Sequence, residues 1–558
     1  MKHLTIFAFL MATTSLASAA SNESFIGQIG VGNGATVGQT AGNNRQATIQ
    51  AGHGNNAVTS QEGPASGGNL NESAIIQIGA KNTALAGQTG GNNRQGTLQV
   101  GVKNYATTSQ AGATGSKKNA SGTAQFGYQN GSVVGQTGGN NSQGTLQIGA
   151  TNGATTGQNS GANGGTNQSG TVQVGYGNNA VSSQNTASTG SKGTGGDNTS
   201  STVQFGYKNT ALTGQDSTGS GSSTNSARSG VDNNAATLQA GGLNYSTTSQ
   251  SGTRKGGTAG TASNDSFTGQ FGWQNGSVVG QTGGNNGQGT LQIGAKNGST
   301  TGQNATDLGA NNGALTLQVG YGNNAVTSQN TSGSAAGYFG SDGHGGTNSA
   351  ATLQFGKNNT ALTGQDSSGI GSAFFLPATG VDNNSLTVQA GKGNYASTSQ
   401  SGASVLTASN DSLIGQIGVG NGAVVGQTNG GNAQATLQAG YKNGATTGQS
   451  TAGSGLGRNA SLTMQAGARN NAVTSQAVAN PLAAGLNGSM IAQIGYKNTA
   501  VVGQSTGLQP MIGANLQGTV QVGANNYAAT TQTASASVSN ASVTAQFGSH
   551  NTAVTVQK

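Results

Sequence analysis

The 558-residue chain has no cysteine, so disulfide bonds cannot hold it together. Charged residues make up only 6% of the chain, which excludes ordinary intrinsic disorder because disordered chains rely on high net charge. Apolar residues make up 32% and 102 residues are glycine, a composition that does not support a conventional hydrophobic core. The glycines follow no three-residue period, which excludes collagen. Backbone pairing, repeated many times, remains as the source of cohesion.

Long apolar runs are absent after the first 20 residues. Lys2 and His3 precede an apolar run over residues 4–16, and small residues follow over residues 17–20. This order is typical of a secretory signal peptide, and the run is too short to span a membrane. We predict that residues 1–20 are a signal peptide and that residues 21–558 are secreted without a membrane anchor of their own.

Clustered ionisable residues are also scarce. One of the four histidines, His3, lies in the signal peptide, and the twelve acidic residues are scattered over connecting segments and repeat edges. General acid–base catalysis and metal binding both need grouped carboxylates or histidines. We therefore predict that the protein is not an enzyme, binds no metal or cofactor and has no small-molecule substrate.

The chain is built instead from one 18-residue repeat, N-x5-Q-x-G-x2-N-x-[AS]-x3-Q, which occurs twenty times. Asn, Gln, Gly, Asn and Gln occupy their five positions in every copy, and the small site is Ala in sixteen copies and Ser in four. The first glutamine of the repeat falls at residues 28, 50, 77, 99, 125, 147, 173, 204, 239, 270, 292, 318, 354, 389, 416, 438, 465, 493, 521 and 546.

Each repeat has the pattern of two short strands. In the first copy Asn22, Gln28 and Gly30 alternate with other residues, and Asn33 and Gln39 do the same after the segment between them. A period of two is the signature of a strand, and the Gly-x-x-Asn segment between the halves is typical of a tight turn. Each repeat therefore predicts strand, turn and strand.

Extra residues occur only between repeats, as segments rich in Gly, Ser and Thr. A stacked repeat protein tolerates insertions at one place in the unit, because they become loops on one side of the stack. We predict an all-β fold: a single β-solenoid over residues 21–558, with about 20 stacked strand–turn–strand rungs that form two facing parallel sheets.

Two assignments of the solenoid interior remain open. A side-chain amide carries both a donor and an acceptor, so stacked Asn and Gln can satisfy one another in ladders, and a buried amide without a partner is costly. We expect the amide face to point inward for this reason. The apolar stripe that includes Ile29 and Leu98 would then face outward and favour lateral bundling. The reverse assignment places these apolar residues inside.

The repeat resembles the curlin repeat of curli, a bacterial functional amyloid, over nearly the whole chain after the signal peptide. The resemblance implies a subunit that crosses the outer membrane unfolded through a dedicated pore and polymerises on a nucleator subunit. It also implies that stacking columns mediate assembly, here Gln28, Asn33, Gln39, Gln50, Asn55, Gln61, Gln77, Asn82, Gln88, Gln546, Asn551 and Gln557. The chain departs from familiar curlin subunits, which have about five repeats, more apolar inward sites and a leader segment that directs export.

We predict a secreted structural subunit of a curli-like extracellular fibre on the bacterial surface, assembling with itself by strand addition for biofilm matrix and adhesion. The repeats begin at Asn22 and end at Gln557, so we expect an open sheet edge at each end. The alternative is a soluble monomeric β-solenoid that binds a target as an adhesin or ice-binding protein.

Basic residues recur in the central turns and should lie along one edge of a stack. They are Lys81, Lys103, Lys208, Lys296, Lys442, Arg469 and Lys497. One hypothesis is that this strip contacts anionic polysaccharide or extracellular DNA. The other is that the charges keep the chain soluble and delay aggregation. The sequence leaves both open.

Overall fold

The computed structural model describes residues 22–63, 70–112, 117–161, 164–189, 195–222, 225–255, 262–305, 311–333, 345–369, 379–404, 408–451, 457–479, 485–507, 513–535 and 538–558. Within these ranges the chain consists of strands and turns, with no helix. The described part of the chain accordingly holds no candidate transmembrane helix. The predicted signal peptide, residues 1–20, lies outside the described residues.

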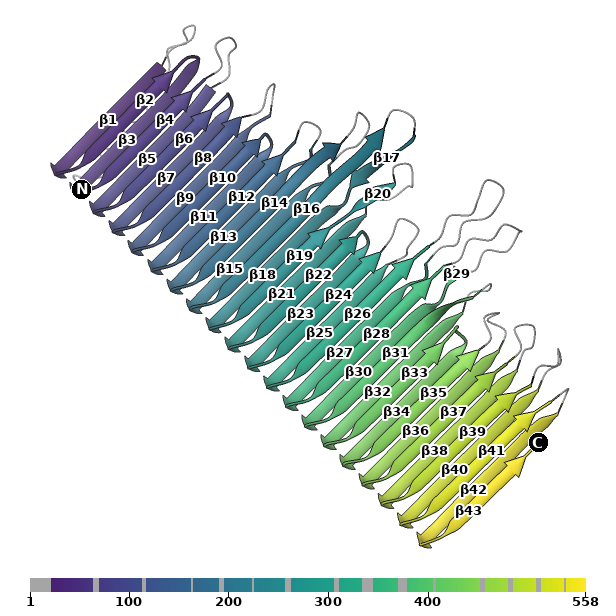
Figure 1. Cartoon of the computed structure of the whole chain (residues 1–558). Helices are drawn as coiled ribbons and strands as arrows, with labels where there is room; N and C mark the ends of the chain where they lie inside the picture. The colour runs from purple at the N-terminus through teal and green to yellow at the C-terminus, as the bar shows by residue number, and fades with distance from the viewer. Residues whose placement is uncertain are drawn as a thin grey trace, which may run out of the picture. The chain divides into compact units, whose positions relative to one another are not determined.

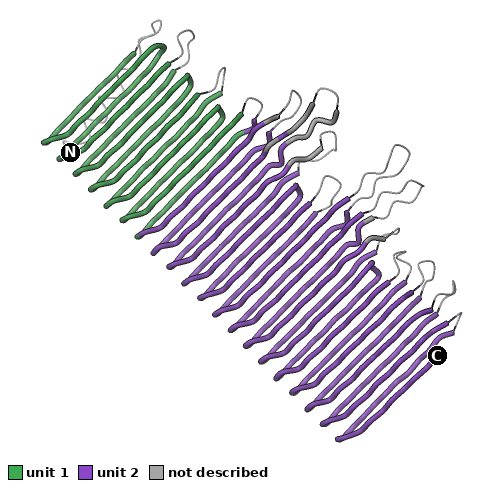
Figure 2. Tube along the Cα trace, viewed as in Figure 1, with its two compact units in different colours: residues 1–162, 166–176 green, residues 163–165, 177–558 purple. Residues whose placement is uncertain are grey.

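The chain divides into two compact units, each built from two parallel sheets (Figure 2). Unit 1 comprises residues 1–162 and 166–176, and unit 2 comprises residues 163–165 and 177–558. We call the sheet made by the first strand of each repeat sheet A, the sheet made by the second strand sheet B, and one strand–turn–strand repeat a rung.

In unit 1, sheet A contains β1 (Asn22–Val31), β3 (Asn43–His53), β5 (Leu70–Ala80), β7 (Asn93–Val102), β9 (Asn119–Tyr128), β11 (Asn141–Ala150) and β13 (Asn167–Tyr176). Sheet B of this unit contains β2 (Gly34–Thr40), β4 (Asn56–Glu62), β6 (Thr83–Thr89), β8 (Tyr105–Gly112), β10 (Gly131–Gly138) and β12 (Gly153–Ser160).

In unit 2, sheet A contains β15 (Asn198–Tyr207), β18 (Asp232–Gly242), β21 (Ser263–Trp273), β23 (Asn286–Ala295), β25 (Asn312–Tyr321), β27 (Asn348–Lys357), β30 (Asp382–Lys392), β32 (Ser409–Val419), β34 (Asn432–Tyr441), β36 (Arg458–Ala468), β38 (Leu486–Tyr496), β40 (Ala514–Ala524) and β42 (Ser539–Ser549). Sheet B contains β14 (Asn179–Thr189), β16 (Thr210–Ser222), β19 (Tyr245–Ser251), β22 (Gly276–Gly283), β24 (Gly298–Ala305), β26 (Asn324–Ser332), β28 (Thr360–Ser368), β31 (Tyr395–Ser404), β33 (Gly422–Thr428), β35 (Gly444–Thr451), β37 (Asn471–Val478), β39 (Thr499–Thr506), β41 (Tyr527–Ala534) and β43 (Thr552–Gln557).

Neighbouring rungs lie side by side (Figure 1) and pair in parallel, with matching positions in register. In unit 1, Gln28 of β1 lies opposite Gln50 of β3. In unit 2, Gln318 of β25 lies opposite Gln354 of β27. The prediction of an all-β solenoid of stacked rungs is therefore confirmed, and like residues lie on like because each rung repeats the sequence of its neighbour.

The turn between the two strands explains two features of the repeat. The residue before the turn asparagine is left-handed in every rung, with φ between 49° and 69°, and it is Lys or Arg in seven of them. The invariant glycine has φ between 99° and 128°. At Gly320 an added Cβ would lie 1.9 Å from the carbonyl oxygen of Gly356 in the next rung. Backbone approach between rungs therefore excludes any side chain at this position.

The amide face points inward, as expected. Gln50 and Gln318 are fully buried, whereas Ile29 is 60% exposed and Ile417 is 65% exposed. Threonine fills most of the inward positions two residues before the first glutamine. Isoleucine replaces it at three buried positions, Ile75, Ile414 and Ile491, where small apolar clusters form with alanine and valine.

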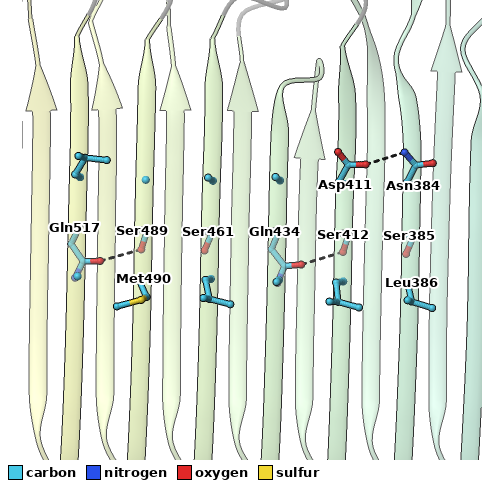
Figure 3. A pocket seen from close by; sticks show the side chains of 18 of the residues that line it. Asn384, Ser385, Leu386, Asp411, Ser412, Gln434, Ser461, Ser489, Met490 and Gln517 are labelled. Atoms are coloured by element: carbon cyan, nitrogen blue, oxygen red, sulfur yellow. Dashed lines mark hydrogen bonds between the residues drawn. The ribbon is translucent and has the colours of Figure 1, made fainter.

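A column made mainly of Ser and Gln, with Ala at residues 235, 314 and 350, lies four residues before the first glutamine, along the inner margin of sheet A. In unit 2 the Ser412 hydroxyl donates to Gln434 Oε1 at 3.2 Å, and the Ser489 hydroxyl donates to Gln517 Oε1 at 3.1 Å (Figure 3). Most inward columns of the interior are thus polar, apart from the alanine column of sheet B and the small apolar clusters, and side-chain hydrogen bonds connect successive rungs.

Some of the connecting segments carry strands that the repeat pattern does not predict. β16 continues past its rung and pairs antiparallel with β17 (Asn225–Gly230), which pairs antiparallel with β20 (Thr253–Lys255). β29 (Thr379–Gly380) pairs antiparallel with the end of β31. The parallel pairing of the rungs gives way to antiparallel pairing only in these segments among the described residues.

Candidate assembly site

The first glutamines form a continuous hydrogen-bonded ladder within each unit. In unit 1, Gln28 Nε2 donates to Gln50 Oε1 at 2.6 Å, and Gln50 Nε2 donates to Gln77 Oε1 at 2.8 Å. Gln50 Nε2 also donates to the main-chain oxygen of Gly34, across the interior in sheet B. Each buried amide therefore has its donor and acceptor satisfied, and it links the two sheets as well as successive rungs.

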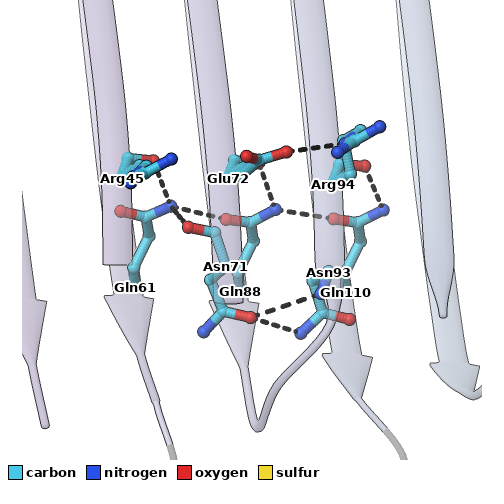
Figure 4. Close-up of polar contacts among 8 residues, drawn as sticks. All are labelled: Arg45, Gln61, Asn71, Glu72, Gln88, Asn93, Arg94 and Gln110. Atoms are coloured by element: carbon cyan, nitrogen blue, oxygen red, sulfur yellow. Dashed lines mark hydrogen bonds and ion pairs between the residues drawn. The ribbon is translucent and has the colours of Figure 1, made fainter. Parts of the chain in front are cut away.

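The second glutamines form a parallel ladder against sheet B (Figure 4). Gln61 Nε2 donates to Gln88 Oε1 at 2.7 Å, and Gln88 Nε2 donates to Gln110 Oε1 at 2.9 Å. In both glutamine ladders the amide nitrogen points toward the next rung along the chain. The glutamine columns therefore have a direction.

The turn asparagines form a third ladder that runs the opposite way. Asn55 Nδ2 donates back to Asn33 Oδ1 at 3.2 Å, and Asn82 Nδ2 donates back to Asn55 Oδ1 at 3.1 Å. The main-chain N–H of Asn55 donates to the same oxygen of Asn33 at 3.0 Å. This second donor fixes which side-chain atom is oxygen, because a flipped amide would set N–H against N–H.

The first asparagines repeat this backward direction. Asn44 Nδ2 donates to Asn22 Oδ1 at 2.8 Å, and Asn93 Nδ2 donates to Asn71 Oδ1 at 3.1 Å (Figure 4). Sequence reasoning identified the columns themselves. It did not indicate that the glutamine and asparagine ladders run in opposite directions, because a residue pattern carries no information on amide orientation.

Charged side chains accompany the first rungs on the outer face. Arg94 Nε lies 2.7 Å from Glu72 Oε2 (Figure 4), and Arg45 Nε lies 3.3 Å from Glu23 Oε2. Glu and Arg alternate over four successive rungs at this position. Exposed pairs of this kind contribute at most about 1 kcal/mol each, so their alternation favours the observed register without holding the rungs together.

The predicted stacking residues differ in burial according to their rung. The six in the second and third rungs are buried, namely Gln50, Asn55, Gln61, Gln77, Asn82 and Gln88. In the first rung Gln28 is exposed and Asn33 and Gln39 are half-buried; in the last rung Gln546 is buried, and Asn551 and Gln557 are half-buried. With the exception of Gln546, the stacking residues that are enclosed in the second and third rungs are thus at least partly accessible in the outermost rungs.

Two sheet edges are open within the described residues. There, β1 and β2 pair only with β3 and β4, and β42 and β43 pair only with β40 and β41. The first rung presents Gln28 Oε1 and Gln39 Oε1, which accept no hydrogen bond there, and the main-chain N–H of Asn33. In a buried rung the equivalent oxygen accepts from the rung before it.

The last rung presents the complementary groups. Gln546 Nε2 donates to the main-chain oxygen of Tyr527, and no further acceptor for it lies among the described residues. In the rungs before it, the Oδ1 of the turn asparagine accepts from the main-chain N–H and the Nδ2 of the next turn asparagine, as Asn498 Oδ1 does from Asn526. Asn551 Oδ1 has no such donor among the described residues. A glutamine donor and an asparagine acceptor therefore lie at one edge, and a glutamine acceptor and an asparagine donor lie at the other.

The central turns carry the predicted basic strip and, beside it, aromatic rings that the sequence analysis did not assign to it. Lys208 Nζ lies 4.9 Å from the ring centre of Tyr207, and Lys497 Nζ lies 5.0 Å from that of Tyr496. Further cation–π contacts are Lys103–Tyr128, Lys296–Tyr321, Lys357–Tyr321, Lys442–Tyr441 and Arg469–Tyr496. The recurrence of an aromatic residue three positions after the first glutamine is the sequence signal for these rings.

The basic residues of the central turns lower the pKa of two tyrosines. A hydrogen bond from Lys442 lowers the pKa of Tyr441, and one from Lys497 lowers the pKa of Tyr496. No acidic residue occupies any of the twenty central turns. Lys81 and the other turn cations therefore face solvent without a carboxylate beside them in the turn.

Comparison of the chain with protein-family models and with curated proteins gives no match.

Proposed function

We propose that the protein is a secreted structural subunit of a curli-like extracellular fibre, growing by addition of whole chains at open sheet edges. The observation that carries the proposal is the complementarity of the two outermost rungs. In a head-to-tail joint, Gln28 Oε1 of one copy would accept from Gln546 Nε2 of another. Asn551 Oδ1 would accept from the Asn33 N–H groups, as Asn33 Oδ1 accepts from Asn55 in unit 1 and Asn526 Oδ1 accepts from Asn551 in unit 2.

The same rule disfavours a head-to-head joint. Two first rungs that met edge to edge would run antiparallel, so like residues would not lie on like, and both would offer glutamine oxygens without a glutamine donor. Two last rungs would both offer glutamine donors without a glutamine oxygen to accept from them. Each mismatch leaves a buried polar group without a partner, at a cost of about 1–3 kcal/mol. Growth therefore proceeds head to tail and yields fibres with a direction.

The resemblance to curlin repeats extends the proposal to partners and location. It implies export through an outer-membrane pore, a nucleator subunit that starts polymerisation, and a fibre at the bacterial surface that serves biofilm and adhesion. The basic strip of the central turns adds a contact with an anionic matrix polymer, either polysaccharide or extracellular DNA. Its support is a row of cations with no carboxylate in any central turn.

The alternative is a soluble monomeric solenoid that acts as an adhesin or ice-binding protein. Ice binding favours a flat and regular array of threonine. The outward positions of sheet B three residues after the turn asparagine mix Thr36, Val58, Leu85 and Thr107 in successive rungs. This column is therefore irregular, which favours the fibre.

The test is assembly of the purified protein without its signal peptide at micromolar concentration. We expect fibres by electron microscopy, a rise in thioflavin fluorescence and a meridional reflection near 4.8 Å, the spacing of paired strands. Chains that stay monomeric over days would refute the proposal and favour the soluble alternative.

Two edge variants test the direction of growth. Val37 and Thr555 are inward and half-buried in the outermost rungs, so a lysine there reaches solvent in the free chain but is enclosed in a joint, where an unpaired charge is costly. We expect Val37→Lys alone and Thr555→Lys alone to stop fibre growth, and a mixture of the two to form the one remaining joint. A joint in either variant alone would contradict head-to-tail assembly.

A further inference from the structure

The outer face of sheet A in unit 2 is apolar over its whole length. Its outward side chains lie three residues before, one before and one after the first glutamine, and we call these the −3, −1 and +1 columns. Of the 39 positions in the 13 rungs of this sheet, only Ser201 is polar; the others are apolar residues or glycine. Many of the large side chains among them are exposed, including Phe267, Leu315, Ile417, Ile494 and Phe547.

The opposite outer face, on sheet B of unit 2, lacks this character. Its column five residues after the turn asparagine is Gly or Ser in every rung but the last two, and its column one residue after that asparagine is Gly, Asn, Thr or Tyr throughout. Only the column between them is mainly apolar, with Val or Leu in nine of the fourteen rungs. The same backbone thus carries one apolar and one mixed face. A need for solubility or for strand-forming residues would shape the outward residues of both faces alike. The difference between the two faces therefore points to a partner for sheet A.

The size of the apolar face matches a stable interface. Thirteen strands about 4.8 Å apart and three columns across cover roughly 60 Å by 15 Å, or about 900 Å². Monomeric soluble proteins rarely expose a patch larger than about 600 Å². Two such faces in contact would bury about 1,800 Å², which lies within the usual range for specific protein interfaces.

We propose that the occupant of this face is the same face of a second copy, so that two solenoids pack side by side through sheet A. This side-by-side contact is separate from end-to-end growth. Only the pairing of whole fibres, as opposed to single chains, rests on the proposed function. The strands of a second copy repeat at the same spacing of about 4.8 Å. Its side chains can therefore fit between successive rungs along all thirteen strands.

Side-chain sizes fit such a pair. If a two-fold axis runs along the stack, the −1 column meets itself and the −3 column of one copy meets the +1 column of the other. Gly289 then faces Ile293 of the second copy, and Ala351 faces Phe355. A small and a larger residue share a rung in this way in β15, β23, β27, β30, β36 and β40. The two rungs with small residues in both columns, β18 and β34, each adjoin one with large residues in both, β21 and β32. The remaining rungs, β25, β38 and β42, also carry larger residues in both columns.

The face does not end sharply at the −3 column. Beyond it lies an open groove of about 920 Å³ with Leu386 and Met490 on one side (Figure 3). At one end its other side is polar, where Asn384 Nδ2 donates to Asp411 Oδ1 at 2.9 Å. In the later rungs that side carries alanine, glycine and the exposed Leu516, so apolar surface continues across the groove there.

The test removes the apolar contact and leaves the stacking columns intact. Ile293→Lys, Phe355→Lys and Ile417→Lys together place three charges on the face in alternate rungs. The matched control places three charges on the outer face of sheet B, by Val278→Lys, Val326→Lys and Val424→Lys. All six side chains point outward in strands, so neither set enters the amide interior.

Two measurements separate this inference from the proposed function. The full chain blocked at both edges by Val37→Lys and Thr555→Lys should form no fibres, and in this chain sedimentation should give a dimer. The sheet A set should convert the dimer to a monomer, and the sheet B control should leave it intact. In fibres of the unblocked chain, the sheet A set should halve the mass per unit length. A monomeric edge-blocked chain, or an equal effect of both sets, would overturn side-by-side pairing while leaving end-to-end growth untouched.

Discussion

Replacing one buried ladder glutamine should open the solenoid locally. Gln318 is fully buried; its Nε2 donates to Gln354 Oε1 and to the Gly298 main-chain oxygen, both at 2.8 Å, and its Oε1 accepts from Gln292 Nε2 at 2.8 Å. Gln318→Leu keeps a similar volume but leaves an oxygen of Gln354 and a hydrogen of Gln292 without partners. At about 1–3 kcal/mol for each buried unsatisfied group, we expect a loss of about 2–6 kcal/mol.

Hydrogen exchange is the suitable assay, because a stack of rungs loses stability at the altered rung and its neighbours rather than everywhere. Protection of the amides in β23, β25 and β27 should fall by at least about 30-fold, which corresponds to about 2 kcal/mol. The matched control, Val319→Thr, lies on the outer face of the same strand and should change local stability by less than about 0.5 kcal/mol. Unchanged protection in Gln318→Leu, or an equal change in the control, would refute the role of the ladder.

Three further results are expected. Gly320→Ala should lower the midpoint of thermal unfolding sharply, because its Cβ would clash with the backbone of the next rung. Gly302→Ala should be neutral or slightly stabilising, because Gly302 has an ordinary φ and open space around its Cβ position. Equal effects of the two variants on thermal unfolding would contradict the backbone contact between rungs. Thr447→Val should raise local stability by about 1 kcal/mol in hydrogen exchange, since the buried Thr447 hydroxyl has no partner among the described residues, and a loss of stability would count against it. Because hydrogen bonding from Lys497 lowers the pKa of Tyr496, Lys497→Met should move phenolate formation to higher pH in an absorbance titration; no shift would exclude that contact.

The stacked fold follows from the sequence because each rung is a copy of its neighbour. The repeat fixes strand, turn and strand, and identical residues in register follow from parallel pairing of identical units. Which face lies inside is harder to predict. By hydropathy Ile29 and Leu98 would enter the core before Gln28 or Gln50, and only the completed ladders make the amide interior favourable.

Other parts of the site depend on information that the repeat does not contain. The opposite directions of the glutamine and asparagine ladders come from main-chain groups such as the Asn55 N–H, whose position is known only once two rungs are stacked. The short strands β17, β20 and β29 lie in segments without periodicity. The cation–π contacts require neighbouring turns to align, although the aromatic position itself is visible in the sequence.

A cysteine cross-link between copies tests the account most directly, since the chain has no cysteine of its own. Head-to-tail stacking in register would place Ile29 of one copy beside Phe547 of the next, as Val522 lies beside Phe547 within the chain. Their Cα atoms would then lie about 4.8 Å apart, within the range that a disulfide bridges. After oxidation of assembled Ile29→Cys/Phe547→Cys protein, we predict a ladder of covalent multimers on a denaturing gel, and monomers from either single variant. Dimers from a single variant, or no multimers from fibres of the double variant, would contradict in-register head-to-tail stacking.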